Sequence, residues 1–198
     1  MAALYTDELE ALLMQAAGRR MRMLGVFSAD LLPSASSINA NRSSSCCCCF
    51  AVNTDPSHRP GKHWVLFIVC WTSPSGTELE YFDSFGMPIE LYRDMYDSCV
   101  RKGLLPLIKQ RNTVVLQDIN TTVCGYYCVL FAYLRATGRS FASAVRFLSN
   151  CGTTALVRDN FVVRTVYARL GRTSSCSSRI VVCCSGSRIR QCCCSAAQ

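Results

Sequence analysis

The sequence predicts an α+β fold in which helices flank a mixed central β-sheet, and three stretches support this prediction. Residues 63–71 carry no charge after the first residue and are apolar on both alternating faces, as in a central strand covered on both sides. Residues 78–85 follow a Ser-Pro-Ser-Gly turn signal and predict the returning strand of a hairpin. Cys124 begins a long apolar helical pattern that Gly138 ends.

Ahead of the hairpin, the chain predicts one helix, a loop region and a buried strand. An amphipathic helix is expected over 7–24, where leucine and alanine recur at helical spacing. Residues 26–33 are expected to be irregular, and the Ser- and Asn-rich stretch 34–45 is expected to be a loop. The cysteine tract Cys46–Cys49 leads into residues 50–52 and predicts the start of a buried strand whose cysteines face both sides of the sheet.

Behind the hairpin the pattern predicts further elements and then a change of composition. We expect a helix, a short strand and, after the Cys124 helix, two more helices, over residues 88–102, 113–117, 140–148 and 155–170. From Arg172 onward the chain is rich in Ser, Cys and Arg. We therefore predict one folded domain over 1–171 and a disordered tail over 172–198.

The composition indicates a folded protein and permits contact with nucleic acid. The chain has 198 residues, half of them apolar, and a formal net charge of +8, of which the tail supplies four arginines. This charge allows DNA binding but does not require it. No uncharged apolar run approaches the roughly 18 residues of a membrane span, and the acidic opening lacks the features of a secretory signal. We expect no membrane partner.

Cysteine is unusually frequent, with fifteen residues in the chain. Without export, these are expected to be reduced thiols of a cytosol or nucleus. Their spacings contain no paired Cys-x-x-Cys units with following histidines, so no metal site is predicted.

Cys124 is the candidate nucleophile because it lies at the first turn of a predicted helix. There the unpaired N–H groups and the positive end of the helix dipole favour a thiolate. Gly125 has no side chain, so a substrate backbone can come close. Gln117, seven residues upstream, is placed to supply an amide that completes an oxyanion hole with the Cys124 N–H. The structural alternative is that Cys124 is one buried cysteine among fifteen.

His63 and Asp83 are the candidate base and its orienting acid. Of the two histidines, His58 lies in a Pro-rich loop and is expected at the surface, whereas His63 stands at the mouth of the central strand. Hairpin pairing brings Asp83 roughly opposite His63, where a buried carboxylate needs a partner. Asp83 would fix the imidazole tautomer and leave the other ring nitrogen facing Cys124. Each residue also has a structural alternative, as a strand-end histidine and as a turn or cap aspartate.

Together these four residues predict a thiol hydrolase. The reaction would be acyl transfer through a thioester. His63 would first accept the thiol proton and then protonate the leaving amine.

Four short pieces of the sequence also occur in a particular order. They read Ala-Val-Asn-Thr at 51–54, Gly-Lys-His-Trp at 61–64, Tyr-Phe-Asp-Ser-Phe-Gly at 81–86 and Gln-x6-Cys-Gly-Tyr-Tyr-Cys at 117–128. In these pieces the chain resembles the adenovirus-type cysteine endopeptidases, the adenain family, within the wider group that includes the SUMO-deconjugating proteases. The resemblance covers roughly residues 5–171.

The resemblance implies a papain-like, adenain-like fold with the nucleophile at the N-terminus of a buried helix. It implies four catalytic roles, for His63 as base, Asp83 as orienting acid, Gln117 as oxyanion donor and Cys124 as nucleophile. Trp64 and Gly125 would line the site. The alternative for Trp64 is that it is an aromatic residue of the apolar core.

The function implied is that of a monomeric endopeptidase that cleaves capsid or core precursors, acting in the virion and in the host nucleus or cytoplasm. No bound cofactor is required, but adenoviral members are activated by a short viral peptide, disulfide-linked ahead of the glutamine, and by DNA. Here the nearest cysteine before Gln117 is Cys99, which argues against that disulfide. Asp83 also replaces the adenoviral glutamate, as in the SUMO-deconjugating relatives. The alternatives are a deconjugating protease for a ubiquitin-like modifier and a DNA- or capsid-binding protein with a retired site.

Overall fold

The structure, a computed structural model, describes residues 3–42, 47–71 and 76–171. In chain order its elements are α1 (Thr6–Ala17), β1 (Arg22–Ser28), α2 (Ala35–Ala40), β2 (Cys47–Asn53), β3 (Trp64–Cys70), β4 (Glu78–Phe82), the 3₁₀ turn η1 (Ile89–Leu91), α3 (Arg93–Arg101), the 3₁₀ turn η2 (Leu105–Leu107), β5 (Ile108–Arg111), α4 (Cys124–Ala136), α5 (Phe141–Asn150) and α6 (Ala155–Leu170). The predicted tail over 172–198, Cys46 and most of the predicted turn before β4 lie outside the described residues. Within the described ranges, no helix combines the length and apolar character needed to cross a bilayer.

The strands form one mixed sheet in the order β1-β2-β3-β4-β5, with β3 at its centre. β3 is antiparallel to both of its neighbours, and Leu66 pairs with Ala51 on β2 and Phe82 on β4. The outer strands β1 and β5 run parallel to β2 and β4. The mixed sheet, the central strand and its hairpin with β4 are therefore confirmed.

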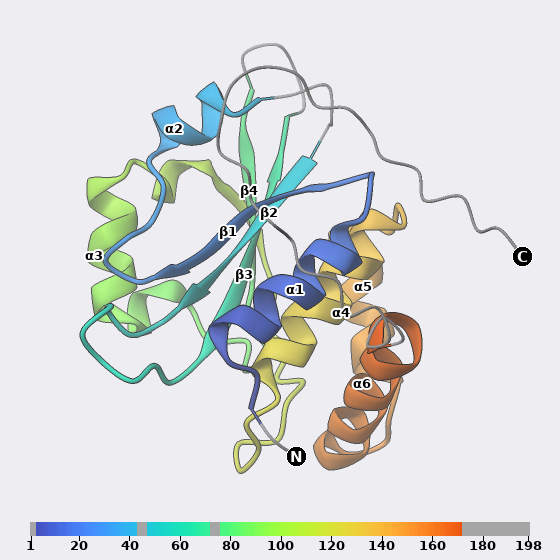
Figure 1. The fold of residues 1–198 in the computed structure, drawn as a ribbon. Helices are drawn as coiled ribbons and strands as arrows, with labels where there is room; N and C mark the ends of the chain where they lie inside the picture. Colours follow the sequence, from blue (N-terminus) through green and yellow to red (C-terminus); the bar gives the residue numbers. More distant parts are fainter. Residues whose placement is uncertain (1–2, 43–46, 72–75, 172–198) are drawn as a thin grey trace, which may run out of the picture.

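Helices cover both faces of the sheet, which gives the molecule three layers (Figure 1). On one face, Leu66 and Ile68 of β3 pack in a cluster that includes residues of α1, α4, α5 and α6. On the other face, Phe67 packs with Ile38 of α2 and Met95 of α3. Because side chains alternate along a strand, β3 supplies both clusters, and each fully buried large apolar side chain contributes about 1.5–3 kcal/mol.

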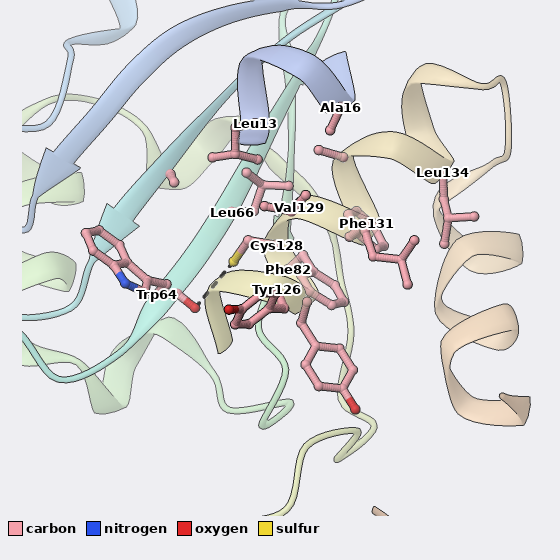
Figure 2. Close-up of a cluster of buried hydrophobic side chains, with 14 of the residues drawn as sticks. Leu13, Ala16, Trp64, Leu66, Phe82, Tyr126, Cys128, Val129, Phe131 and Leu134 are labelled. Atoms are coloured by element: carbon pink, nitrogen blue, oxygen red, sulfur yellow. Dashed lines mark hydrogen bonds between the residues drawn. The ribbon is translucent and has the colours of Figure 1, made fainter. Parts of the chain in front are cut away.

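The helix that begins at Cys124 is the most enclosed helix of the first layer. Ten of the 13 residues of α4 are buried. Leu13 and Ala16 of α1 lie over it, and Phe131 stacks on Phe82 of β4 with ring centroids 4.0 Å apart (Figure 2). This packing holds the start of α4 in a constant position against β3 and β4. The predicted helix and its end before Gly138 are confirmed.

The first predicted helix is too long. The prediction over 7–24 is wrong beyond Ala17, because Gly18 takes a φ of +56° and ends the helix. Residues Arg22–Ser28 instead form β1, so the expected irregular stretch 26–33 is partly strand. β1 is an outer strand, and none of its seven residues is fully buried. Its sequence therefore lacks the alternation of apolar and polar residues that identifies a strand.

Three other predictions need correction. The expected loop over 34–45 contains α2, whose cap residue Ser34 accepts a hydrogen bond from a backbone N–H. The helix expected over 88–102 is divided into η1 and α3. Residues 113–117 are not a strand, because Leu116 and Gln117 donate their N–H groups to the turn after β4 and not to a neighbouring strand. The strand of this region is β5, which lies earlier in the chain. The two last helices are confirmed as α5 and α6.

Candidate active site

Cys124 is the first residue of α4 and is 6% exposed. The cap residue Val123 offers no side-chain hydrogen bond to the first turn. The backbone N–H of Trp64 donates to the Cys124 sulfur at 3.5 Å. One turn later, the Cys128 thiol donates to the Trp64 carbonyl at 3.5 Å (Figure 2). β3 and α4 are thus joined at the sulfur, which sits at the positive end of the helix dipole.

His63 and Asp83 meet at the same end of the sheet. His63 directly precedes β3, and Asp83 directly follows β4. The His63 Nε2 lies 2.6 Å from the Asp83 Oδ1, and because a carboxylate accepts, Nε2 carries the proton. Leu66 pairs with Phe82, so the two residues are offset diagonally across the hairpin and not directly opposite. The predicted contact between His63 and Asp83 is present in the structure, and their catalytic roles stay a prediction.

The carboxylate of Asp83 is completely buried and fully occupied by hydrogen bonds. Besides the imidazole, it accepts the backbone N–H groups of Phe85 at 2.9 Å and Met87 at 3.1 Å, and the hydroxyl of Tyr92 at 2.8 Å. These four donors allow a charge to stay buried that would otherwise be very costly. The Asp83 carboxylate therefore has one orientation, with Oδ1 directed at the ring.

The imidazole of His63 lies between this carboxylate and the sulfur. Its ring interacts electrostatically with the Cys124 side chain, which helps to raise the His63 pKa, and it stacks on Phe85 with centroids 4.7 Å apart. Burial lowers the pKa of His63, but hydrogen bonds and charge from Asp83 and Cys124 outweigh it and raise the pKa to about 9. The His63 ring is therefore protonated at neutral pH in the folded protein.

Gln117 lies near this group but does not contact the sulfur. Among the described residues, the Cys124 sulfur accepts a hydrogen bond from the Trp64 N–H, and Gln117 is not a partner. The Gln117 Nε2 donates to the Thr121 carbonyl at 2.8 Å and more weakly to the Thr121 hydroxyl at 3.3 Å. Its side-chain oxygen accepts from Ser84 at 2.7 Å. Its role as oxyanion donor remains a prediction, and its expected position at the end of a strand is wrong.

The segment that carries Gln117 is held by residues that the sequence analysis did not identify. The buried Asp159 of α6 accepts from the Thr121 hydroxyl at 2.6 Å, the Tyr127 hydroxyl at 2.9 Å and the Asp118 N–H at 3.2 Å. Near the start of this segment, the Asn112 side chain holds the backbone of Asp83: its oxygen accepts from the Asp83 N–H, and its amide donates to the Asp83 carbonyl. No sequence signal marks these residues, because their partners are 29 to 41 residues away along the chain.

The two residues expected to line the site are in contact with the N-terminal segment. A Cβ atom on Gly125 would lie 3.2 Å from two side-chain atoms of Leu4 and 3.4 Å from the Trp64 ring. The Trp64 indole N–H donates to the Leu4 carbonyl at 3.1 Å, and Trp64 belongs to the first apolar cluster. In this structure the space beside Gly125 that was expected to admit a substrate backbone is therefore filled by Leu4.

Comparison with known proteins identifies the fold. No family model matches the sequence, and no curated protein matches it. Among solved structures, an ASFV protease aligns with a TM-score of 0.52 and 16% identity over 81% of this chain and 66% of its own. The effector protein XopD of Xanthomonas campestris, bound to ubiquitin, aligns with a TM-score of 0.51 and 16% identity over 82% of this chain and 91% of its own.

This chain has the fold that these two proteins share, which agrees with the predicted fold class. The chain spans about two-thirds of the length of the ASFV protease. At such low identity the likeness concerns the fold alone, so activity and substrate rest on the residues.

Proposed function

We propose that this chain is a cysteine endopeptidase with Cys124 as nucleophile, His63 as base and Asp83 as the acid that orients the imidazole. The observation that supports this most is the 2.6 Å hydrogen bond between the Asp83 Oδ1 and the His63 Nε2, in a ring whose pKa is also raised by the Cys124 side chain at the start of α4. The order carboxylate, imidazole, thiol is the one that nucleophilic catalysis needs.

In the proposed reaction His63 first accepts the proton of the Cys124 thiol. The Cys124 sulfur attacks the scissile carbonyl carbon, and the electron pair of the C=O bond moves to the oxygen. His63 then gives its proton to the leaving amine as the C–N bond breaks and the thioester forms. Water attacks the thioester with His63 as base, which releases the acid and restores the thiol.

We propose that the oxyanion is stabilised by the Cys124 backbone N–H and the Gln117 amide. The Thr121 carbonyl accepts one of the two amide hydrogens at 2.8 Å, whereas the contact with the Thr121 hydroxyl is longer, at 3.3 Å. The substrate oxygen would replace that hydroxyl as the second acceptor. Asp159 would act through Thr121 to hold the amide in place. A donor in an oxyanion hole contributes about 2.7–4 kcal/mol to transition-state stabilisation.

For the substrate, we propose a viral structural precursor protein cleaved during capsid maturation. The Phe82–Gly86 piece and the seven-residue step from Gln117 to Cys124 are the features that look adenoviral. The likeness to an ASFV protease agrees with this proposal. In the same proposal the protein acts as a monomer without a bound cofactor, in the virion and in the host nucleus or cytoplasm.

A deconjugating protease for a ubiquitin-like modifier is the second candidate. Asp83 at the acid position and the likeness to XopD, solved with ubiquitin bound, favour it. Stimulation by a viral peptide or by DNA separates the two candidates further, since only the maturation protease is expected to respond. The net charge of +8 is compatible with DNA binding.

The test is cleavage by the full chain of peptides with Gly-Gly or Gly-Ala sites and of a SUMO-type or ubiquitin fusion, with and without duplex DNA. We expect peptide cleavage that Cys124→Ser and His63→Ala abolish. Cleavage of the folded fusion alone would reject the maturation protease in favour of the deconjugating enzyme. No cleavage of either, together with no reaction of Cys124 with a thiol-directed electrophile, would reject both candidates.

A further inference from the structure

A second group of thiols lies at the opposite end of α4 from the proposed nucleophile. Cys47, the first residue of β2, is directly paired with Cys70, the last residue of β3. The Cys47 thiol donates to the Cys70 sulfur at 3.6 Å. Both residues are half-buried, so a small oxidant can reach them. No part of the proposed peptidase chemistry uses this pair.

The positions of the two residues in the sheet suit a disulfide. Directly opposed residues of an antiparallel pair have Cα atoms about 4.5–5.5 Å apart, inside the range of about 4.4–6.8 Å that disulfides span. The sulfurs, 3.6 Å apart, must approach by only about 1.5 Å to reach bonding distance, which side-chain rotation supplies.

Charged groups beside Cys70 make its sulfur the reactive member of the pair. The Arg135 Nη2 lies 3.8 Å from the Cys70 sulfur, and Arg135 also forms a two-pronged ion pair with the buried Glu80 at 2.6 and 2.7 Å. The Glu80 Oε1 is 4.0 Å from the same sulfur. The guanidinium is therefore fixed in place next to the thiol.

The acidity of the thiols follows this arrangement. The hydrogen bond from Cys47 lowers the pKa of Cys70, and Arg135 adds to this effect, against the opposing influence of burial and Glu80. By contrast, burial raises the pKa of Cys48, Cys99 and Cys151. Since the thiolate is the form that reacts with oxidants, Cys70 is favoured over these cysteines.

We propose that Cys47 and Cys70 form a redox-active dithiol that hydrogen peroxide converts to an intramolecular disulfide. The Cys70 thiolate attacks the peroxide O–O bond, which forms a sulfenic acid and releases hydroxide that takes up a proton to become water. The Cys47 sulfur then attacks the Cys70 sulfur, the S–O bond breaks, and a second water leaves with the thiol proton. Two thiols are oxidised by two electrons in total and one peroxide is reduced to two waters.

This dithiol is separate from the proposed nucleophile. Arg135 follows Cys124 by eleven residues on α4, which places the two ends roughly 16 Å apart at 1.5 Å per helical residue. Oxidation of the pair therefore joins β2 to β3 without involving the Cys124 sulfur.

The test is treatment of the full chain with one equivalent of hydrogen peroxide, followed by alkylation, trypsin digestion and mass spectrometry. Trypsin separates Cys70, on residues 63–93, from the cysteine tract on 43–62. We expect these two peptides to be disulfide-linked, and the link to disappear on treatment with dithiothreitol. Cys47→Ser must abolish the link, because Cys47 is the residue of the described strand β2 that is paired with Cys70.

The matched control is Cys151→Ser, since Cys151 is another half-buried thiol but has no role in the pair. It should leave the link at its wild-type yield. The wild-type measurement does not depend on how any variant folds. Absence of the link in the wild type, or its persistence in Cys47→Ser, overturns the proposal.

Discussion

Replacing Asp83 by asparagine tests the electrostatic link between the carboxylate and the imidazole. The carboxylate accepts from the His63 Nε2 at 2.6 Å and helps to raise the His63 pKa from 6.5 to about 9. At about 1.4 kcal/mol per pKa unit, this change corresponds to roughly 3 kcal/mol of stabilisation of the protonated ring in the folded state. Asparagine keeps the shape of the side chain but removes the charge, so most of this stabilisation should disappear.

The loss of this stabilisation should appear in how the free energy of unfolding depends on pH. Because the folded pKa of His63 lies above the unfolded one, the stabilisation is fully present below about pH 6.5 and is lost as the pH rises through about 9. We therefore expect the difference in unfolding free energy between wild type and Asp83→Asn to be larger at pH 6 than at pH 10, by up to about 3 kcal/mol.

Urea unfolding followed by circular dichroism measures this difference. Tyr92→Phe is the matched control, since it removes one hydrogen bond to the same carboxylate, 2.8 Å long, but leaves the charge. Its cost should be about 1–3 kcal/mol, and it should change by less than about 1 kcal/mol between pH 6 and pH 10. A wild-type to Asp83→Asn difference that is equal at pH 6 and pH 10, or larger at pH 10, would refute the reasoning.

Three further changes test other parts of the account. Gln117→Ala should lower kcat/KM for a peptide by a factor that corresponds to about 2.7–4 kcal/mol, and an unchanged rate would remove Gln117 from the oxyanion hole. Asp159→Asn loses the charged acceptor of the Thr121 hydroxyl, so kcat should fall more than KM changes, whereas equal loss of activity and of folded protein would point to a purely structural role. Gly86→Ala places a Cβ atom 2.8 Å from the backbone of residues 113 and 114, at a residue whose φ is +66°. It should lower the free energy of unfolding by at least about 1–3 kcal/mol in the same urea assay. A free energy of unfolding within about 0.5 kcal/mol of wild type, which is the effect of a neutral surface change, would contradict the tight contact.

The parts of the fold that could be predicted are those whose sequence pattern is local. β3 is apolar on both alternating faces because both of its faces are buried, and α4 is a long apolar run because it is enclosed by other helices. His63 and Asp83 could be paired in advance because they flank the two strands of one hairpin. In these cases the information lies within about twenty residues of chain.

The parts that could not be predicted depend on partners far away in the sequence. β1 is half-buried and takes its place only because β2 lies beside it, so its residues show no strand pattern. Gln117 was identified from its spacing to Cys124, but the hydrogen bonds of its amide to Thr121 follow from the loop conformation, which α6 holds through Asp159. The contact of Leu4 with Gly125 and Trp64 likewise arises only when α1 docks over α4.

The most direct test of the central claim is intact-mass analysis of the full chain after reaction with a peptide that ends in Gly-Gly and carries a thiol-directed electrophile. We predict one adduct, located on Cys124 by peptide mapping, which is absent in Cys124→Ser and strongly slowed in His63→Ala. An adduct that forms equally well in Cys124→Ser, or at an unchanged rate without the His63 imidazole, would contradict the proposed catalytic group.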